Sequence, residues 1–366
     1  MTRKLSLTGS ERILIIKLSS IGDVVMATPV AKALRQAFPK AYIAWIVEEK
    51  SKDILIGNPY LDEVIVWTRN LTKGGVLTRL RYFLSGLAEI NAILRSKRFD
   101  LVIDLQGLFR SAIIGLLTRA RYRLGFDCVR EGASLFYNIR YPSNETRIRN
   151  SQAYLDILRP LGIESEDIHM HVPINDDDRA FACSLIGKYL SGEQRPVIAL
   201  CPATTWPNKH WTEEGWAILA DRLVSCYNVL PVFLGSSVDI PLIERIRIQM
   251  RHEAVSLAGR TTLRQAAAVI EQCNLIIAVD TGLLHIAVAL DRPVVGVFGP
   301  SGWQYFVKKD NFIPVAKNLP CIPCFRHPTC KDFDCMKAIS PEDILAAVER
   351  LLTLETKAQS ACRRNP

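Results

Sequence analysis

Apolar and polar residues follow one another along this chain in blocks that predict alternating strands and helices. Residues 12–17, 41–47 and 99–104 are short apolar runs of the kind found in buried strands, and residues 24–38 have the spacing of an amphipathic helix. From residue 196 the same succession begins again. Strands that alternate with helices form parallel β-α-β units, so the pattern predicts an α/β fold class.

The chain changes character near its middle. Between residues 176 and 195, charged residues and glycine replace the apolar blocks, which predicts a linker. Because 366 residues suffice for about two domains, we expect two doubly wound, Rossmann-like domains that face a central cleft. The expected ranges are 1–180 and 181–354, followed by a polar, flexible tail at 355–366.

One β-turn-α-β unit in the second half gathers polar groups in its turn. A buried strand is followed by Asp280, Thr281 and Gly282, and a short helix that is expected to begin near Leu283 carries His285. Open α/β sheets bind ligands at this end of a strand, where a carboxylate suits sugar hydroxyls and free helix N–H groups favour a phosphate. The residues also allow a simpler interpretation, in which Asp280 or Thr281 caps the helix and His285 is a buried core residue.

Two other loops of the second half end predicted strands with similar groups. Thr204, Thr205 and Lys209 follow one strand, and Ser236 follows the next. Hydroxyls, a lysine and helix N-termini at one edge of a sheet predict a site for a nucleoside diphosphate. The alternative for Lys209 is an ordinary solvated surface lysine.

In the first half, the loop after the first predicted strand offers a single carboxylate, Asp23. Its neighbours are small and apolar, and it is placed to remove a proton from an attacking hydroxyl. It is equally suited to cap the helix that follows. The loop has neither the G-x-G-x-x-G pattern of dinucleotide sites nor the Walker pattern G-x-x-x-x-G-K-[ST].

The charge of the chain narrows the expected partners. A net charge of +9 favours an anionic partner. Residues 79–98 form a predicted basic amphipathic helix, which suits either an anionic bilayer surface or the cover of a sheet. Residues 119–149 interleave arginines with aromatic residues, a composition that suits a nucleic acid strand or an acidic sugar. Because the sequence contains no RNA-binding motif, we expect no nucleic acid partner.

Cysteine usage and hydropathy indicate the compartment. No apolar run reaches the roughly 20 residues of a membrane span, and the N-terminus lacks a signal-peptide pattern, so we expect a cytoplasmic protein with reduced thiols. Four of the ten cysteines lie close together in the sequence, namely Cys321, Cys324, Cys330 and Cys335. They lack the paired spacing of a zinc ribbon, so packed reduced thiols are favoured and a zinc site stays open.

Three of these motifs are similar to those of one enzyme family. They are the N-terminal segment that ends in Asp23, the loop with Thr204 and Lys209, and the turn from Asp280 to His285. In this order the chain resembles the bacterial lipopolysaccharide heptosyltransferases, glycosyltransferase family 9. The segment around Gln106 and the stretch that follows it are more similar to heptosyltransferase I, whereas the cysteine-rich segment is more similar to heptosyltransferase II.

The resemblance implies a GT-B fold and an inverting transfer of L-glycero-D-manno-heptose from ADP-heptose to the Kdo of the lipopolysaccharide inner core. It implies an N-terminal acceptor-binding domain, a C-terminal nucleotide-sugar-binding domain, and peripheral contact with the anionic inner face of the inner membrane. It implies no metal and no other cofactor. The Kdo–lipid A acceptor of heptosyltransferase I is favoured. The alternatives are heptosyltransferase II, a relative with another nucleotide sugar, and a non-catalytic nucleotide-sugar-binding protein.

The resemblance also gives roles to particular residues. Asp23 is the expected general base. The expected donor-binding residues are Thr204, Thr205, Lys209, Ser236, Asp280, Thr281, Gly282, Leu283 and His285. The expected acceptor-binding residues are Ser19, Ser20, Gly22, Gln106, Arg110, Arg123, Arg130 and Arg140.

Overall fold

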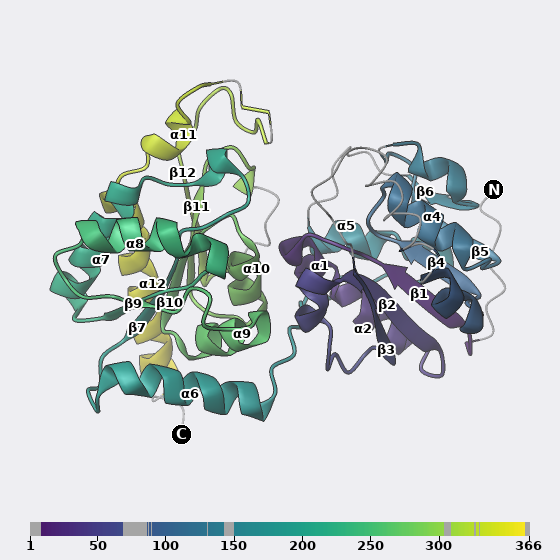
Figure 1. Ribbon diagram of the computed structural model, residues 1–366, viewed down its shortest axis with the longest axis horizontal. Helices are drawn as coiled ribbons and strands as arrows, with labels where there is room; N and C mark the ends of the chain where they lie inside the picture. Colours follow the sequence, from purple (N-terminus) through teal and green to yellow (C-terminus); the bar gives the residue numbers. More distant parts are fainter. Residues whose placement is uncertain are drawn as a thin grey trace. The chain divides into compact units, whose positions relative to one another are not determined.

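The computed structural model divides the chain into two compact units, Met1–Pro173 and Ile174–Pro366 (Figure 1). It describes residues 9–68, 86, 88, 90–129, 131–142, 150–303, 309–325, 327–328 and 330–362. Among these residues, no helix combines the length and the apolar character needed to cross a bilayer.

The first unit is built on a six-stranded sheet in which all neighbouring strands are parallel. Its strands are β1 (Arg12–Ile16), β2 (Tyr42–Glu48), β3 (Glu63–Trp67), β4 (Leu101–Asp104), β5 (Tyr122–Phe126) and β6 (Ile139–Tyr141). Their order is β3-β2-β1-β4-β5-β6. Its helices are α1 (Ile21–Ala27), α2 (Pro29–Ala37), α4 (Phe109–Leu117) and α5 (Ser151–Asp156), with short 3-10 helices η1 (Glu49–Ile54), η2 (Ala133–Phe136) and η3 (Arg159–Leu161).

The second unit repeats this plan. Its strands are β7 (Val197–Cys201), β8 (Leu230–Phe233), β9 (Val255–Ser256), β10 (Leu275–Val279), β11 (Val294–Phe298) and β12 (Phe312–Ala316). The sheet order is β12-β11-β10-β7-β8-β9, again with parallel neighbours. Its helices are α6 (Asp176–Leu190), α7 (Glu213–Tyr227), α8 (Ile240–Gln249), α9 (Leu263–Gln272), α10 (Gly282–Ala289), α11 (Asp334–Lys337) and α12 (Pro341–Cys362), with η4 (Pro207–Lys209) and η5 (Ser237–Asp239).

The central strands are apolar over almost their whole length, which matches sheets covered by helices on both faces. In the first unit, Ile13, Leu14, Ile15 and Ile16 of β1 are all fully buried. In the second unit, α7, α8 and α12 pack with one face of the sheet in a single core, and α9 and α10 lie on the other side (Figure 1). The alternation of short apolar strands and helices therefore produces the expected α/β architecture.

The predicted linker was wrong over most of its length, because residues 176–190 form helix α6. Asn175 caps this helix by accepting a hydrogen bond from the N–H of Asp178, and the first turn carries three aspartates. Carboxylates in a first turn interact favourably with the helix dipole, so the charge that suggested a linker instead starts a helix. At the other end of the unit, α12 continues to Cys362, into the stretch expected to be a tail.

The strand order places one topological switch point in each unit. In the first sheet the chain runs outward in opposite directions from β1 and β4, and in the second from β7 and β10. Doubly wound sheets bind ligands at the carboxyl ends of such strand pairs. The loops after these four strands are therefore where a site is expected.

Candidate functional site

At the switch point of the second unit, the loop after β7 meets the loop after β10 through an ion pair. Lys209 Nζ lies 2.5 Å from Asp280 Oδ2, and the two side chains are only 12% and 13% exposed. On the other side of the carboxylate, His285 Nε2 of α10 lies 3.7 Å from Asp280 Oδ1. Lys209 Nζ also lies 4.0 Å from the centre of the Trp206 ring. Lys209 is therefore a buried, paired cation and not a solvated surface lysine.

The two cationic or hydrogen-bonding neighbours keep Asp280 ionised. Burial alone would raise the pKa of Asp280, but His285 and Lys209 together lower it well below the usual range of a carboxyl group. Thr281 is the N-cap residue of α10 by position, but its side chain makes no capping hydrogen bond. The Asp280 side chain is engaged by Lys209 and His285 instead, and His285 is buried, as the simpler interpretation expected.

Thr204 connects the same two loops by a second route. Its hydroxyl donates to the carbonyl of Asp280 at 3.0 Å, and its own carbonyl lies 2.9 Å from His210 Nε2. Thr205 is exposed beside it. Gly282 and Leu283 form the partly exposed first turn of α10. These expected donor-site residues lie on the two loops of one switch point.

Ser236 lies on a different loop, after β8. Its N–H and its hydroxyl both donate to Asp239 Oδ2, at 2.8 and 2.6 Å, and the residue is exposed. Ser236 thus starts η5 at the same edge of the sheet, without a contact with the Lys209–Asp280 pair.

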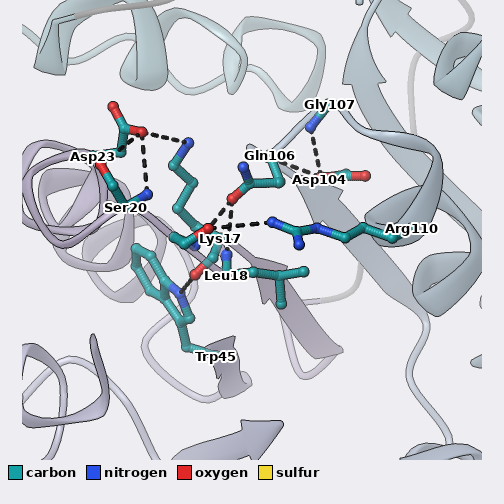
Figure 2. Close-up of polar contacts among 10 residues, drawn as sticks. Lys17, Leu18, Ser20, Asp23, Trp45, Asp104, Gln106, Gly107 and Arg110 are labelled. Carbon is teal, nitrogen blue, oxygen red and sulfur yellow. Dashed lines mark hydrogen bonds and ion pairs between the residues drawn. The ribbon is translucent and has the colours of Figure 1, made fainter. Parts of the chain in front are cut away.

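At the switch point of the first unit, Asp23 occupies the first turn of α1. The N–H and the hydroxyl of Ser20 each donate to Asp23 Oδ2 at 3.2 Å (Figure 2). The N-cap residue of α1 is therefore Ser20, and Asp23 takes part in the cap as the third residue of a capping box, not as the N-cap itself. Its side chain is nevertheless 35% exposed. The hydrogen bonds and the ion pair that Asp23 forms with described residues all involve Oδ2. The cap therefore leaves Oδ1 available for a second partner.

A buried lysine lies beside this carboxylate. Lys17 directly follows β1, its side chain is 5% exposed, and its Nζ lies 3.7 Å from Asp23 Oδ2. Burial alone would lower the pKa of Lys17, but Asp23, Tyr154 and Asp104 raise it above its usual value. Lys17 is therefore a permanent positive charge next to Asp23. We did not expect it from the sequence, where it reads as the polar end of an apolar strand.

Further side chains connect the loops after β1, β2 and β4. Arg110 Nη2 donates to Ser19 Oγ at 3.3 Å, and Arg110 Nη1 lies 3.3 Å from Glu48 Oε1 at the end of β2. Gln106 Oε1 accepts hydrogen bonds from the N–H groups of Leu18 and Ser19, both at 3.1 Å (Figure 2). Gly22 is buried in the first turn of α1. The structure thus gathers the expected acceptor residues of this region around Asp23.

Arg123 and Arg140 are not part of this group. Arg123 of β5 donates to the carbonyls of Phe136 and Ala120, at 2.9 Å each, and so fixes the connections around its own strand. Arg140 is exposed on β6. Arg130 lies outside the described residues, as do residues 79–85, 87 and 89 of the predicted basic helix at 79–98. Residues 86, 88 and 90–96 of that stretch are helical.

The four neighbouring cysteines are free thiols. Cys335 is buried, and the Cys321, Cys324 and Cys330 thiols add to the effect of burial in raising the pKa of Cys335 to about 11. Within the part of the chain that the structure describes, no three His, Cys, Asp or Glu side chains are arranged to hold a metal ion. Asn208 Nδ2 donates to the carbonyl of Phe325 at 2.6 Å, which fixes the cysteine-rich segment to the loop that carries Lys209.

Comparison with known proteins gives a consistent result. The sequence model of glycosyltransferase family 9 (heptosyltransferase) matches residues 88–333. Lipopolysaccharide heptosyltransferase 1 of Pseudomonas aeruginosa is 28% identical, over 93% of this chain and 98% of that protein. Lipooligosaccharide heptosyltransferase 2 of Haemophilus ducreyi is also 28% identical, over 80% of this chain and 85% of that protein.

Two solved structures from Escherichia coli share the fold. A heptosyltransferase with ADP-2-deoxy-2-fluoro heptose has a TM-score of 0.66 and 25% identity, over 92% of this chain and 99% of that one. The ADP-heptose lipopolysaccharide heptosyltransferase II has a TM-score of 0.75 and 23% identity, over 94% and 99%. The expected fold class, α/β with two Rossmann-like units of the GT-B type, is confirmed.

Proposed function

Since this chain belongs to glycosyltransferase family 9, the heptosyltransferases, we propose that it moves L-glycero-D-manno-heptose from ADP-heptose to the Kdo of the lipopolysaccharide inner core. Heptosyltransferases of lipopolysaccharide biosynthesis are similar to it over most of its length. The ADP-sugar donor is supported by the E. coli heptosyltransferase with ADP-2-deoxy-2-fluoro heptose.

The observation that carries the catalytic part of the proposal is the setting of Asp23. One of its oxygens is held by Ser20 and by the buried Lys17, and the other forms no hydrogen bond or ion pair with a described residue, in a side chain that is 35% exposed. A pure binding protein has no need of a fixed, accessible carboxylate at a switch point. A transferase that activates a hydroxyl does need one.

The reaction assigns a separate task to each unit. Asp23 Oδ1 takes the proton of the acceptor hydroxyl while that oxygen forms a bond to the anomeric carbon of the heptose. The bond from this carbon to the diphosphate breaks on the opposite face, so the configuration inverts and ADP leaves with the electron pair. Negative charge then develops on the leaving phosphate, where preorganised N–H donors and cations stabilise the transition state.

The second unit supplies such donors. Lys209 has three N–H bonds and uses one on Asp280, so it can donate to a phosphate oxygen without leaving its partner. The N–H groups at the start of α10, from Gly282 and Leu283, suit the same anion. Thr204, Thr205, Ser236, Thr281 and His285 are the further donor-site residues of the proposal.

On the acceptor side, Ser19, Ser20 and Gly22 belong to the same loop and first helical turn as Asp23. Arg110 donates to Ser19 and is the arginine best placed for a Kdo carboxylate. Arg130 and Arg140 belong to the proposal through the resemblance alone. Arg123 is the least suitable of the arginines because two backbone carbonyls already occupy its guanidinium group. Because the acceptor is a lipid, we also propose that the protein works at the inner face of the inner membrane.

A second candidate acceptor is an inner core that already carries one heptose. The H. ducreyi heptosyltransferase 2 favours this candidate, because its sequence identity to this chain, 28%, is the same as that of the P. aeruginosa heptosyltransferase 1. The two candidates share the donor and the chemistry, so only the acceptor separates them.

Mass spectrometry of the product tests the function. Purified protein is incubated with ADP-heptose and either Kdo–lipid A or the same acceptor with one heptose already attached. We expect a product one heptose heavier from Kdo–lipid A. A product only from the heptosylated acceptor would assign the second activity, and no product from either would contradict the proposed reaction.

A further inference from the structure

Gln106 ties together the two loops of the first unit's switch point. Its side-chain oxygen accepts hydrogen bonds from the N–H groups of Leu18 and Ser19, both at 3.1 Å (Figure 2). Because both partners are N–H donors, the atom between them must be the amide oxygen. Gln106 belongs to the loop after β4, whereas Leu18 and Ser19 belong to the loop after β1.

The contact matters because the backbone hydrogen bonds between β1 and β4 end just before these two loops. The register of β1 and β4 ends with the pair Ile16 and Asp104, followed by one hydrogen bond from the N–H of Leu105 to the carbonyl of Ile16. From there the two connections run in opposite directions, as in every doubly wound sheet. Gln106 continues the contact where the ladder of backbone hydrogen bonds ends.

Gln106 is itself anchored in the core. Asp104 Oδ1 accepts the N–H of Gln106 at 2.8 Å and the N–H of Gly107 at 3.1 Å (Figure 2). Tyr137 donates its hydroxyl to Asp104 Oδ2 at 2.7 Å, and Asp104 is 1% exposed. The backbone of Gln106 is therefore held by a buried carboxylate that is itself hydrogen-bonded, which gives its side chain a rigid base.

The support reaches Asp23 through one residue. Gln106 fixes the N–H of Ser19, and the next residue, Ser20, donates two hydrogen bonds to Asp23 Oδ2. We propose that Gln106 is a positioning residue for sugar transfer, which holds the loop of Asp23 in its reactive geometry. The proposal rests on the proposed role of Asp23 as the base, and it differs from the direct acceptor contact expected from the sequence.

Two substitutions distinguish the effect of the Gln106 side-chain oxygen, which accepts the two hydrogen bonds, from the effect of the side chain's shape. Gln106→Met has a similar length but accepts no strong hydrogen bond, whereas Gln106→Glu keeps an oxygen for both N–H groups. We expect kcat of Gln106→Met to fall about 10- to 100-fold, because small displacements of a catalytic group cost rates of this order. The KM values for donor and acceptor should stay within about twofold, and Gln106→Glu should recover most of the lost kcat.

Gln265→Met is a matched control. Gln265 also accepts a backbone N–H, from Thr262 at 2.9 Å, but it does so at the start of α9 in the second unit. This variant should keep the kcat of the unmodified protein. If Gln106→Met raised only the KM for the acceptor, Gln106 would bind the acceptor directly and would not be a positioning residue. An unchanged kcat in Gln106→Met would also overturn the positioning role.

Hydrogen exchange gives a readout that does not depend on the assay. The amide protons of Leu18 and Ser19 should exchange slowly in the unmodified protein and in Gln106→Glu, and faster in Gln106→Met. If the unmodified protein transfers no heptose but these amides behave as expected, the proposed function fails and the support stands. Unchanged protection in Gln106→Met would overturn the support itself.

Discussion

The pair of Lys209 and Asp280 is the most strongly coupled feature of the second unit's site. Both side chains are largely buried and their charged atoms are 2.5 Å apart. Removing one member of a buried ion pair leaves the other charge without compensation, which costs more than the pair itself contributes. The pair therefore has a structural role in addition to the proposed contact with the diphosphate.

Lys209→Met should lower the free energy of unfolding of the second unit by about 3 kcal/mol, because Asp280 would then be buried with His285 as its remaining partner. Replacing both residues, as Lys209→Met with Asp280→Asn, should restore more than half of the loss because no buried charge is left. Urea denaturation of the three proteins measures both effects. A double variant as unstable as the single one would contradict this account.

The lowered pKa of Asp280 predicts how the pair responds to acid. An unfolded Asp titrates near pH ~3.9, and the folded value is lower. The stabilisation from the ionised carboxylate is therefore fully present above about pH 4, and it is lost as the pH falls towards the folded pKa. The difference in unfolding free energy between the unmodified protein and Asp280→Asn should stay constant from about pH 7 to about pH 5 and shrink below about pH 4. A difference that keeps its full neutral-pH value at about pH 3 would show that the pKa of Asp280 is not lowered on folding.

Sequence reasoning located Asp23, Lys209 and Asp280 because each follows a predicted strand, where ligands of α/β sheets bind. It did not locate Lys17, the buried partner of Asp23, or the contact that the Gln106 side chain makes. The oxygen of Gln106 contacts the backbone of residues 18 and 19 across an interval of almost ninety residues, and a local pattern carries no information about such a contact. The helix-cap role of Asp23, by contrast, depends on Ser20 three residues away and was predictable.

At the level of elements, β4 and β5 depend on a close approach between a glycine and an aromatic ring. A Cβ added at Gly125 would lie 2.2 Å from a ring carbon of Tyr137. The ring would have to move, and its hydrogen bond to the buried Asp104 would break. Gly125→Ala should therefore destabilise the first unit by about 2 to 4 kcal/mol, measured by urea denaturation.

Gly187→Ala serves as the control for that substitution. Gly187 lies inside α6, and an added Cβ would meet no atom within 4 Å. Alanine at this position should stabilise the protein by about 0.5 to 1 kcal/mol, because it restricts the unfolded chain and favours the helix. Equal effects of the two substitutions would mean that the contact with Tyr137 does not determine the cost at Gly125.

The elements themselves were predictable where burial dominates. The apolar runs became the central strands, because a strand that is covered on both faces has few polar positions. The start of α6 was not predicted. One asparagine and three aspartates in a row are typical of a loop, but here the asparagine caps the helix and the aspartates form its first turn. A composition rule fails where charge stabilises a helix end.

On the scale of the whole molecule, one topology occurs twice in the chain. Each unit has a parallel sheet of six strands in the same order, and each has polar side chains on the two loops of its switch point. The chemistry of the two loop pairs differs: an accessible carboxylate in the first unit, and a lysine with the N-terminus of α10 in the second. A transfer reaction needs both kinds of group, a base for the acceptor and a cation for the leaving diphosphate.

This division of tasks predicts that the two steps of the reaction can be damaged separately. Asp23→Asn keeps an oxygen for the hydrogen bonds of Ser20, so the loop should keep its structure while the base is lost. Donor binding, assigned to the second unit, should not change. The measurement that tests this most directly is the rate of heptose transfer at saturating ADP-heptose and acceptor, with the donor dissociation constant determined on the same preparation.

For Asp23→Asn we expect kcat to fall by about 10² to 10⁴, the range that a general base contributes, and the dissociation constant of ADP-heptose to stay within about twofold of its original value. A variant that transfers heptose at the full rate would contradict the assignment of Asp23 as the base. It would also remove the main reason for dividing the reaction between the two units.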